Sequence, residues 1–349
     1  MAKNDRKIIY EILQIMCLYP KLIKNPKYKM NKKNGGNIPP VNDERVTMVP
    51  IGCQTCIECR GQKARDWNVR LQEDIKDNTN GQYWVLTYST ESIKKLTTEI
   101  QRYKDKKGKP YEGYKLDNAI AIRSMRYFLE RWRKKYGKSL RHWAVTELGG
   151  KHTEHLHINI IAWTDEQEIV ESIWQYGHVW RGYISKKTGK IERTYVTAKT
   201  VNYIVKYVSK VDAKHINYQA IVLTSPGIGR RYIEHGDARK NKYNEKKTEE
   251  RYRAPNGAKM AIPIYWRNKI YTDEEREKLW LQKLDKNERW VCGELVAADD
   301  EKTYNNVLDY HRRRTKQIGY PDPDERWNKR EYEEARRILI QRNRIQEKE

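Results

Sequence analysis

Two neighbouring segments, residues 141–148 (RHWAVTEL) and 155–163 (HLHINIIAW), constrain the fold more than any other feature of the chain. Both are rich in β-branched and aromatic residues, which is typical of strands. The residues between them, GGKHTE, have the composition of a turn. A turn this short joins antiparallel neighbours, because parallel strands need a long crossover. The sequence therefore predicts an antiparallel strand pair at the centre of a sheet.

Further strands and helices are expected around this pair. Aromatic and β-branched content indicates strands at 83–89 and 178–184. Apolar residues at helical spacing indicate helices at 117–136, 164–177 and 197–211. The order β-α-β-β-α-β-α predicts an α+β fold in which helices flank a central antiparallel sheet.

The length of the chain allows one large domain or two modest ones. We expect three regions: an N-terminal region with a zinc element at 1–80, a core with the sheet at 81–215, and a basic, largely helical extension at 216–349. The extension contains helical patterns near 273–286 and 324–347, separated from the core by turn signals and a charge-dense loop.

Charge indicates the partner. The 349 residues include 71 Lys and Arg against 47 Asp and Glu, a formal net charge of +24. Positive charge along most of the chain suits a polyanion, so nucleic acid is the expected partner, and a merely soluble, Lys-rich surface is the alternative.

Location is also an expectation from the sequence. The chain has no stretch of about 18 apolar residues, and its start, MAKNDRKIIYEILQIM, lacks the apolar core of a signal peptide. No membrane span is therefore expected. Five cysteines in such a chain favour a reducing compartment and metal ligands or thiols over disulfides.

The second central strand opens with His155 and His157, which share a face because side chains alternate along a strand. A hairpin would bring Glu147, at the end of the preceding strand, close to both. Two neutral imidazoles and a carboxylate suit a divalent ion and leave positions open for a phosphate oxygen and water. Glu154 competes for the third position but should point to the opposite face. The alternative is a pair of half-buried histidines without a metal.

The segment 202–210, NYIVKYVSK, repeats the pattern Tyr-x-x-Lys. Tyr203 and Tyr207 would share one face of a helix, and Lys206 and Lys210 each follow three residues later. Tyrosine is a weak nucleophile at neutral pH, but a nearby ammonium favours the phenolate. A phosphodiester polarised by a metal also reacts with a weaker nucleophile. The pattern thus indicates two nucleophiles. The alternative is an amphipathic helix with tyrosines packed on the sheet.

Cys53, Cys56 and Cys59 form C-x2-C-x2-C, which supplies three ligands where a structural zinc needs four. Cys17, in MCLYPKLIKNP, is the best fourth ligand, and the alternative is that it is a small buried hydrophobe. Cys292 stands alone and is expected to be structural.

Glu147 and the triplet His155-Leu156-His157, followed by the two-tyrosine helix, resemble the HUH (His-hydrophobic-His) endonucleases. The resemblance is closest to the replication-initiation proteins of microviruses, especially their gokushovirus-like branch. It extends over roughly residues 15–275 and includes GCQTCIECR…DWNVRL, YWVLTYS and PNGAKMAIPIYWRNKIY. The chain departs from it in the turn GGKHTE, which lacks the usual Arg, and in its near absence of Phe.

The resemblance implies an HUH/RRM-like fold and a metal-dependent endonuclease that nicks and rejoins DNA in rolling-circle replication. Mg²⁺ or Mn²⁺ on the histidines and Glu147 would grip the scissile phosphate of single-stranded origin DNA. One tyrosine would form a 5′-phosphotyrosine and release a 3′-OH for a host polymerase, and the other would later close the circle. The expected setting is the cytoplasm of a bacterial host infected by a phage.

No phosphate-binding loop is recognisable in the sequence, so unwinding should fall to a host helicase. Two alternatives remain for the function. One is a plasmid Rep or relaxase-type HUH nickase, which the doubled tyrosine disfavours. The other is a non-enzymatic, zinc-containing DNA-binding protein, which leaves the Tyr-Lys helix unexplained.

Overall fold

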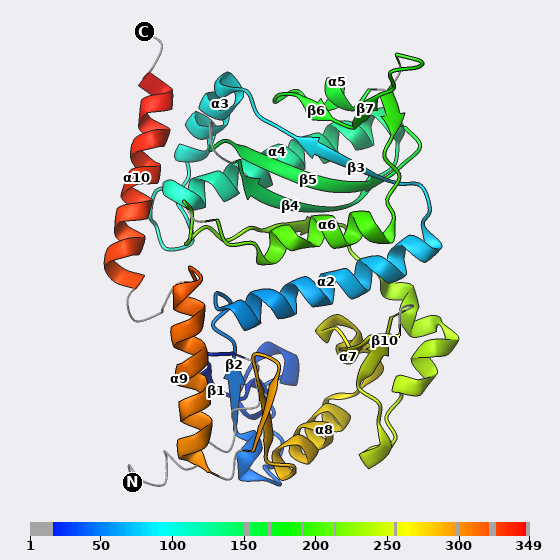
Figure 1. Ribbon diagram of the computed structural model, residues 1–349, viewed down its shortest axis with the longest axis vertical. Coiled ribbons are helices and arrows are strands. Elements are labelled where there is room, and N and C mark those ends of the chain that lie inside the picture. Colours follow the sequence, from blue (N-terminus) through cyan, green and yellow to red (C-terminus); the bar gives the residue numbers. More distant parts are fainter. Residues whose placement is uncertain are drawn as a thin grey trace. The chain divides into compact units, whose positions relative to one another are not determined.

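The computed structural model describes residues 17–149, 154–166, 169–189, 191–212, 214–254, 257–297, 300–320 and 326–346 (Figure 1). The N-terminal segment and residues 150–153 of the expected turn lie outside the described residues. The chain forms two compact units, each built from two stretches of sequence: Met1–Asp66 with Tyr232–Asp324, and Trp67–Arg231 with Glu325–Glu349. The division into three regions expected from the sequence stays a prediction beside this grouping.

The second unit contains a five-stranded antiparallel sheet with the strand order β6-β3-β5-β4-β9. Its strands are β3 (Gly81–Leu86), β4 (Arg141–Leu148), β5 (Leu156–Trp163), β6 (Val179–Trp180) and β9 (Val222–Thr224). β4 and β5 pair along their whole length, from Arg141 opposite Trp163 to Leu148 opposite Leu156. The predicted antiparallel pair and the α+β class are therefore confirmed.

Helices cover both faces of this sheet. They are α3 (Thr90–Gln101), α4 (Gly113–Tyr136), α5 (Val170–Trp174) and α6 (Ala198–Ser209), together with the C-terminal half of α2 (Ile57–Asp77). α10 (Arg326–Gln346) packs against α3 and α4. Figure 1 shows α4 on one side of the strands and α6 on the other.

Two elements differ from the sequence expectation. The helix expected at 164–177 is represented by α5, which covers Val170–Trp174, and residues 167–168 of that span lie outside the described residues. The strand expected at 178–184 is divided: β6 stays in the sheet, while β7 (Gly182–Ile184) leaves it and pairs with β8 (Ile191–Arg193).

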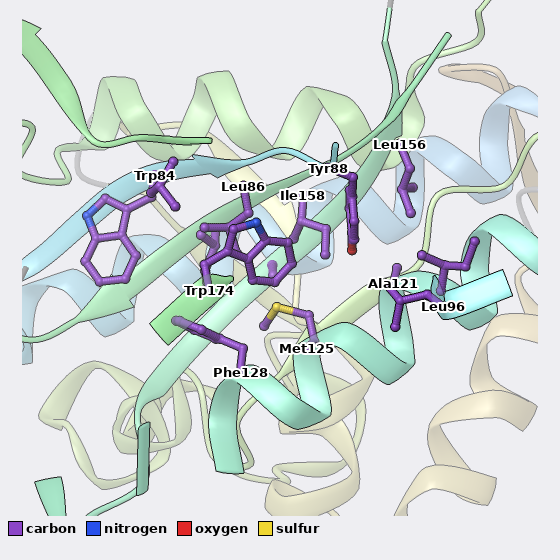
Figure 2. Packing of buried hydrophobic residues seen from close by; sticks show 14 of the residues in the cluster. Trp84, Leu86, Tyr88, Leu96, Ala121, Met125, Phe128, Leu156, Ile158 and Trp174 are labelled. Carbon is purple, nitrogen blue, oxygen red and sulfur yellow. The ribbon is translucent and has the colours of Figure 1, made fainter. Parts of the chain in front are cut away.

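The main hydrophobic core lies between one face of the sheet and α3, α4 and α5. Because side chains alternate along a strand, Trp84 and Leu86 of β3 and Ile158 of β5 point to this face, where Figure 2 shows them against Met125 and Phe128 of α4. Each such fully buried side chain contributes about 1.5–3 kcal/mol of transfer free energy.

The opposite face of the sheet carries the alternate residues and packs against α6 and the C-terminal half of α2. Trp67 of α2 meets Trp143 of β4 edge-on, with ring centroids 5.8 Å apart. The Gln72 side chain donates to the Ala198 carbonyl at 3.2 Å, which ties α2 to the start of α6. This packing fixes α6 beside the end of β5 that begins with the histidines.

The first unit is built from hairpins and helices. Its strands are β1 (Lys21–Lys24), β2 (Met48–Ile51), β10 (Arg251–Arg253), β11 (Lys259–Ala261), β12 (Glu288–Val291) and β13 (Glu294–Ala297). Its helices are α7 (Ile264–Ile270), α8 (Asp273–Asp285) and α9 (Glu301–Gln317). Short 3-10 helices occur at Pro26–Tyr28, Lys32–Asn34, Glu44–Val46, Arg230–Glu234, Gly236–Asn241 and Glu245–Lys247. Among its described residues, the region 216–349, expected to be largely helical, thus also holds five short strands, β9 to β13.

Within the described residues, no helix combines the length and the apolar character needed to cross a lipid bilayer.

Candidate active site

The β4–β5 hairpin brings Glu147 and His157 together. They are direct cross-strand partners, so their side chains stand on the same face of the sheet. Beyond the last pair of the strands, the Gly149 amide donates to the His155 carbonyl at 2.7 Å. A Cβ on Gly149 would lie 2.8 Å from Cε1 of His157, so glycine leaves the space that the imidazole occupies. His155 lies just before the strand and is half-buried.

Both oxygens of the Glu147 carboxylate have partners. Lys210 Nζ lies 2.7 Å from Oε1, and Asn159 Nδ2 donates to Oε2 at 3.2 Å. The hydroxyl of Tyr83 in turn donates to Oδ1 of Asn159 at 2.6 Å. Sequence reasoning missed Asn159 and Tyr83, although a buried Asn two residues after His157 in an apolar strand was a signal available in the sequence.

His157 is arranged to be neutral. Burial lowers its pKa, and the negative charge of Glu147 opposes that shift only in part. A neutral imidazole has the lone pair that a metal ligand needs. The donor types therefore fit a divalent ion. Within the part of the chain that the structure describes, however, the histidines and Glu147 do not form a group of three with closely spaced ligand atoms. The positive charge beside the Glu147 carboxylate is the Lys210 ammonium group.

The two tyrosines of α6 meet at their hydroxyls. α6 begins with a capping box formed by Thr197 and Thr200, which sets the helix register. The Tyr207 hydroxyl donates to the Tyr203 hydroxyl at 2.8 Å, and the rings meet edge-on. Tyr203 is 46% exposed, whereas Tyr207 is 9% exposed. The helix thus presents one accessible phenol and one covered phenol.

Electrostatics distinguish the two tyrosines. Burial raises the pKa of Tyr207, and its hydrogen bond with Tyr203 and the charge of Glu147 raise it further. Lys206 Nζ lies 3.7 Å from the centroid of the Tyr203 ring, and Lys210 Nζ lies 5.4 Å from that of Tyr207. Tyr203 accepts the hydrogen bond from Tyr207 and has the closer ammonium group.

Glu154, which the sequence offered as a competitor for the third metal position, belongs to a different network. Its carboxylate lies 3.3 Å from Arg336 and 3.4 Å from Nε2 of His215, and Arg337 donates to its carbonyl at 3.0 Å. Burial alone would raise the pKa of Glu154, but the Arg336 hydrogen bond and the surrounding positive charges lower it overall.

Four cysteines in the first unit converge. The sulfur atoms of Cys17, Cys53, Cys56 and Cys59 all lie within 4.8 Å of one another, and none of the four is in a disulfide. The Cys53 amide points to the Cys17 sulfur at 3.2 Å, and the Cys56 amide to the Cys53 sulfur at 3.2 Å. Tetrahedral zinc with Zn–S bonds of about 2.3 Å requires sulfurs about 3.8 Å apart. This cluster could therefore hold a metal such as zinc after small adjustments.

The comparisons with known proteins agree with a replication role. A family model for replication-associated proteins of the ORF2 type matches residues 83–212, which include Glu147, both histidines and α6. The chain is 25% identical over 327 residues to the replication-associated protein ORF2 of Spiroplasma virus 4, a match that covers 84% of this chain and 96% of that protein. No solved structure matches. These likenesses support a phage replication protein.

Proposed function

We propose that this chain is a rolling-circle replication initiator that nicks single-stranded origin DNA and rejoins it through tyrosine phosphodiesters. The observation that carries the proposal is the pair of hydroxyls 2.8 Å apart on α6. Lys210, three residues after Tyr207, connects that helix to Glu147 and hence to the histidine strand. The match to the replication-associated family supports the proposal, because it spans all of these residues.

A divalent ion, Mg²⁺ or Mn²⁺, would be held by His155, His157 and Glu147. When bound, it would polarise the scissile phosphodiester. Lys210 would then exchange its contact with Glu147 for a phosphate of the DNA. Replacing both histidines by Ala should abolish nicking and leave most of the DNA affinity, which rests on Lys and Arg and falls steeply with salt.

Tyr203 is the better placed of the two to cleave first. It is the more exposed phenol, and it accepts the hydrogen bond that Tyr207 donates. In the cleavage step Tyr203 loses its phenolic proton and its oxygen bonds to phosphorus. The bond between phosphorus and the 3′ oxygen breaks, and that oxygen gains a proton. The free 3′-OH serves a host polymerase, while a host helicase unwinds the duplex ahead.

Tyr207 would attack the junction regenerated after one round. The 3′-OH released by that attack would displace Tyr203 from its phosphodiester and close the circle. Because the phosphotyrosine retains the energy of the phosphodiester bond, closing the DNA circle needs no nucleoside triphosphate. Two phenols one helical turn apart can thus alternate at one phosphate-binding site.

The test is a covalent adduct between the protein and single-stranded origin DNA in Mn²⁺, seen on a denaturing gel. The double variant Tyr203→Phe/Tyr207→Phe should form no adduct while folding normally, because only two hydroxyls are lost. Tyr207→Phe should still cleave once. Tyr203→Phe should also cleave once, but at a lower rate. Tyr195→Phe is the matched control, since Tyr195 is 48% exposed just before α6.

An adduct that persists in the double variant would place the nucleophile elsewhere. DNA binding by the wild type without any adduct would favour a non-enzymatic DNA-binding protein.

The four cysteines are proposed to hold a structural zinc. Native mass measurement should show about one Zn per chain, and a chelator should remove it and destabilise the protein. Cys56→Ser should lose the metal, whereas Cys292→Ser should keep it. A protein purified without chelators that carries no metal would contradict this site.

A further inference from the structure

A continuous series of aromatic rings runs from the two tyrosines of α6 to the β7–β8 hairpin. Tyr207 and Tyr203 have ring centroids 5.6 Å apart, and Tyr203 meets Tyr83 of β3 at 6.1 Å. Tyr83 meets Trp180 of β6 at 5.6 Å, and Trp180 meets Tyr183 of β7 at 5.3 Å. All four contacts are edge-on. We call these five residues the aromatic row.

The members of the aromatic row differ in exposure. Tyr83 and Tyr207 are 7% and 9% exposed, so they are packed inside the unit. Tyr203 and Tyr183 are 46% and 72% exposed. Next to Tyr183, Ile184 is 69% exposed. A single exposed apolar side chain is ordinary, but exposed apolar residues gathered on one small hairpin mark an interaction surface.

The backbone of the hairpin is built to hold Tyr183 in this position. Gly182 has φ 149°, and a Cβ there would meet the Glu192 carbonyl oxygen of the paired strand. Only glycine therefore lets β7 leave the sheet directly after Trp180 and pair closely with β8. Arg181, between these residues, is anchored by Glu171 at 3.2 Å. The turn thus places Tyr183 against Trp180 with most of its ring uncovered.

Exposed lysines occur on the same hairpin and on α6, although Glu192 lies directly across from Tyr183 on β8. Lys186 and Lys187 are exposed in the hairpin loop, and Lys199 and Lys206 are exposed on α6. Lys206 Nζ lies 3.7 Å from the centroid of the Tyr203 ring. Aromatic faces interleaved with ammonium groups match single-stranded nucleic acid, whose bases stack while its phosphates pair with cations. A duplex would hide the faces of its bases, and a lipid surface would favour an apolar face without interruptions.

We propose that the β7–β8 hairpin, with Tyr183 as its main contact, is a stacking platform for bases of single-stranded DNA that flank the phosphate held at the tyrosine pair. The assignment of that phosphate rests on the proposed function. Tyr203 and Tyr183 are the exposed members of the aromatic row, so a strand leaving the nucleophiles would meet the ring of Tyr183 next. Tyr83 also connects the row to the site, through its hydrogen bond to Asn159.

The first experiment measures binding of a fluorescent oligothymidine to the full chain by anisotropy. Tyr183→Ala should weaken binding about 5- to 150-fold, the range typical of one stacked base. Tyr183→Phe should bind like the wild type, because the ring remains. Tyr332→Ala is the matched control and should have no effect, since Tyr332 is 73% exposed on α10 of the same unit.

Three results would overturn the platform. They are a Tyr183→Ala affinity within twofold of the wild type, a Tyr183→Phe variant as weak as the Ala variant, and an equal loss of affinity for a duplex of matched length. Circular dichroism shows whether the variants fold. Lys186→Ala/Lys187→Ala offers a second route to the same surface, because it should reduce the salt dependence of binding without removing a ring.

A second readout separates this inference from the proposed function. At saturating origin DNA, Tyr183→Ala should form the covalent adduct at the wild-type rate, but it should need more DNA to reach half of that rate. If the wild type forms no adduct while Tyr183→Ala still loses affinity, the platform stands and the proposed reaction fails. If the wild type forms the adduct and Tyr183→Ala matches it at every DNA concentration, the platform fails alone.

Discussion

Glu147 lies near the end of β4 and Glu154 lies two residues before the start of β5, and their carboxylates meet different surroundings. Glu147 pairs with one lysine, Lys210, whose side chain is 46% exposed. Glu154 meets Lys214, His215, Arg336 and Arg337 within 4.0 Å. A carboxylate whose single cationic partner is partly exposed can exchange that cation for a metal ion at little cost. A carboxylate surrounded by several cations stabilises the folded structure and is not available to bind a metal ion.

The network around Glu154 comes from the last helix of the chain. Arg337 of α10 is 1% exposed and donates to both oxygens of Asp117 on α4, each at 2.9 Å. Its third contact is the Glu154 carbonyl. Gln341 bonds the amide and the carbonyl of Gly113 at the start of α4. α10 therefore fixes the residue that precedes His155. Glu154 anchors the strand, whereas Glu147 is the carboxylate that can take part in chemistry.

The largest expected effect is on stability. Arg337→Met should lower the free energy of unfolding by about 3–5 kcal/mol, because it leaves the buried Asp117 carboxylate without its cation. Arg342→Met is the control and should cost less than about 1 kcal/mol, since Arg342 is exposed and lies 3.6 Å from Glu112. Urea unfolding of both variants measures this difference. Equal losses would mean that α10 does not anchor the strand.

The next effect falls on activity. Glu147→Gln should reduce the rate of adduct formation in Mn²⁺ by at least about 100-fold while leaving the unfolding free energy within about 1 kcal/mol, because its ion pair is partly exposed. Glu154→Gln should show the reverse pattern, with a larger loss of stability and a smaller loss of rate. Single-turnover adduct assays and urea unfolding on the same preparations decide this. Similar behaviour of the two variants would remove the distinction between the carboxylates.

The smallest effect is a dependence of stability on pH. Burial, and then the charge of Arg337, lower the pKa of His215 in the folded state. The unfolded chain, with a histidine pKa near 6.5, then binds more protons. Stability should therefore be complete above about pH 6.5 and fall as the pH drops through that value, by at most about 1.4 kcal/mol per pH unit for each such histidine.

Burial also lowers the pKa of His142 and His157, so they shift stability in the same direction. His215→Gln should make the profile between pH 7.5 and 5.5 less steep without making it flat. Urea unfolding across this range provides the measurement. A profile as steep as that of the wild type would show that the buried His215 does not titrate as inferred.

Part of the site follows from local pattern. The alternation of residues around His157 and the short connection to β4 are enough to predict that Glu147 shares its face, and β4–β5 pairing confirms the hairpin. The four-residue spacing of Tyr203 and Tyr207 is enough to predict one helical face, and α6 contains both. These inferences succeed because hairpins and helices involve residues close in the sequence, where the backbone period sets which side chains are neighbours.

The remainder depended on contacts between residues far apart in the chain. No local pattern shows that Lys210 pairs with Glu147, that Tyr83 supports Asn159, or that Arg337 fixes Glu154, 183 residues earlier. Cys17 was the best candidate in the sequence for the fourth ligand, and the fold brings it to the other three cysteines. Local periodicity sets the elements and their faces, whereas packing of the whole chain selects which distant side chains share a burial site and must satisfy one another's charges and hydrogen bonds.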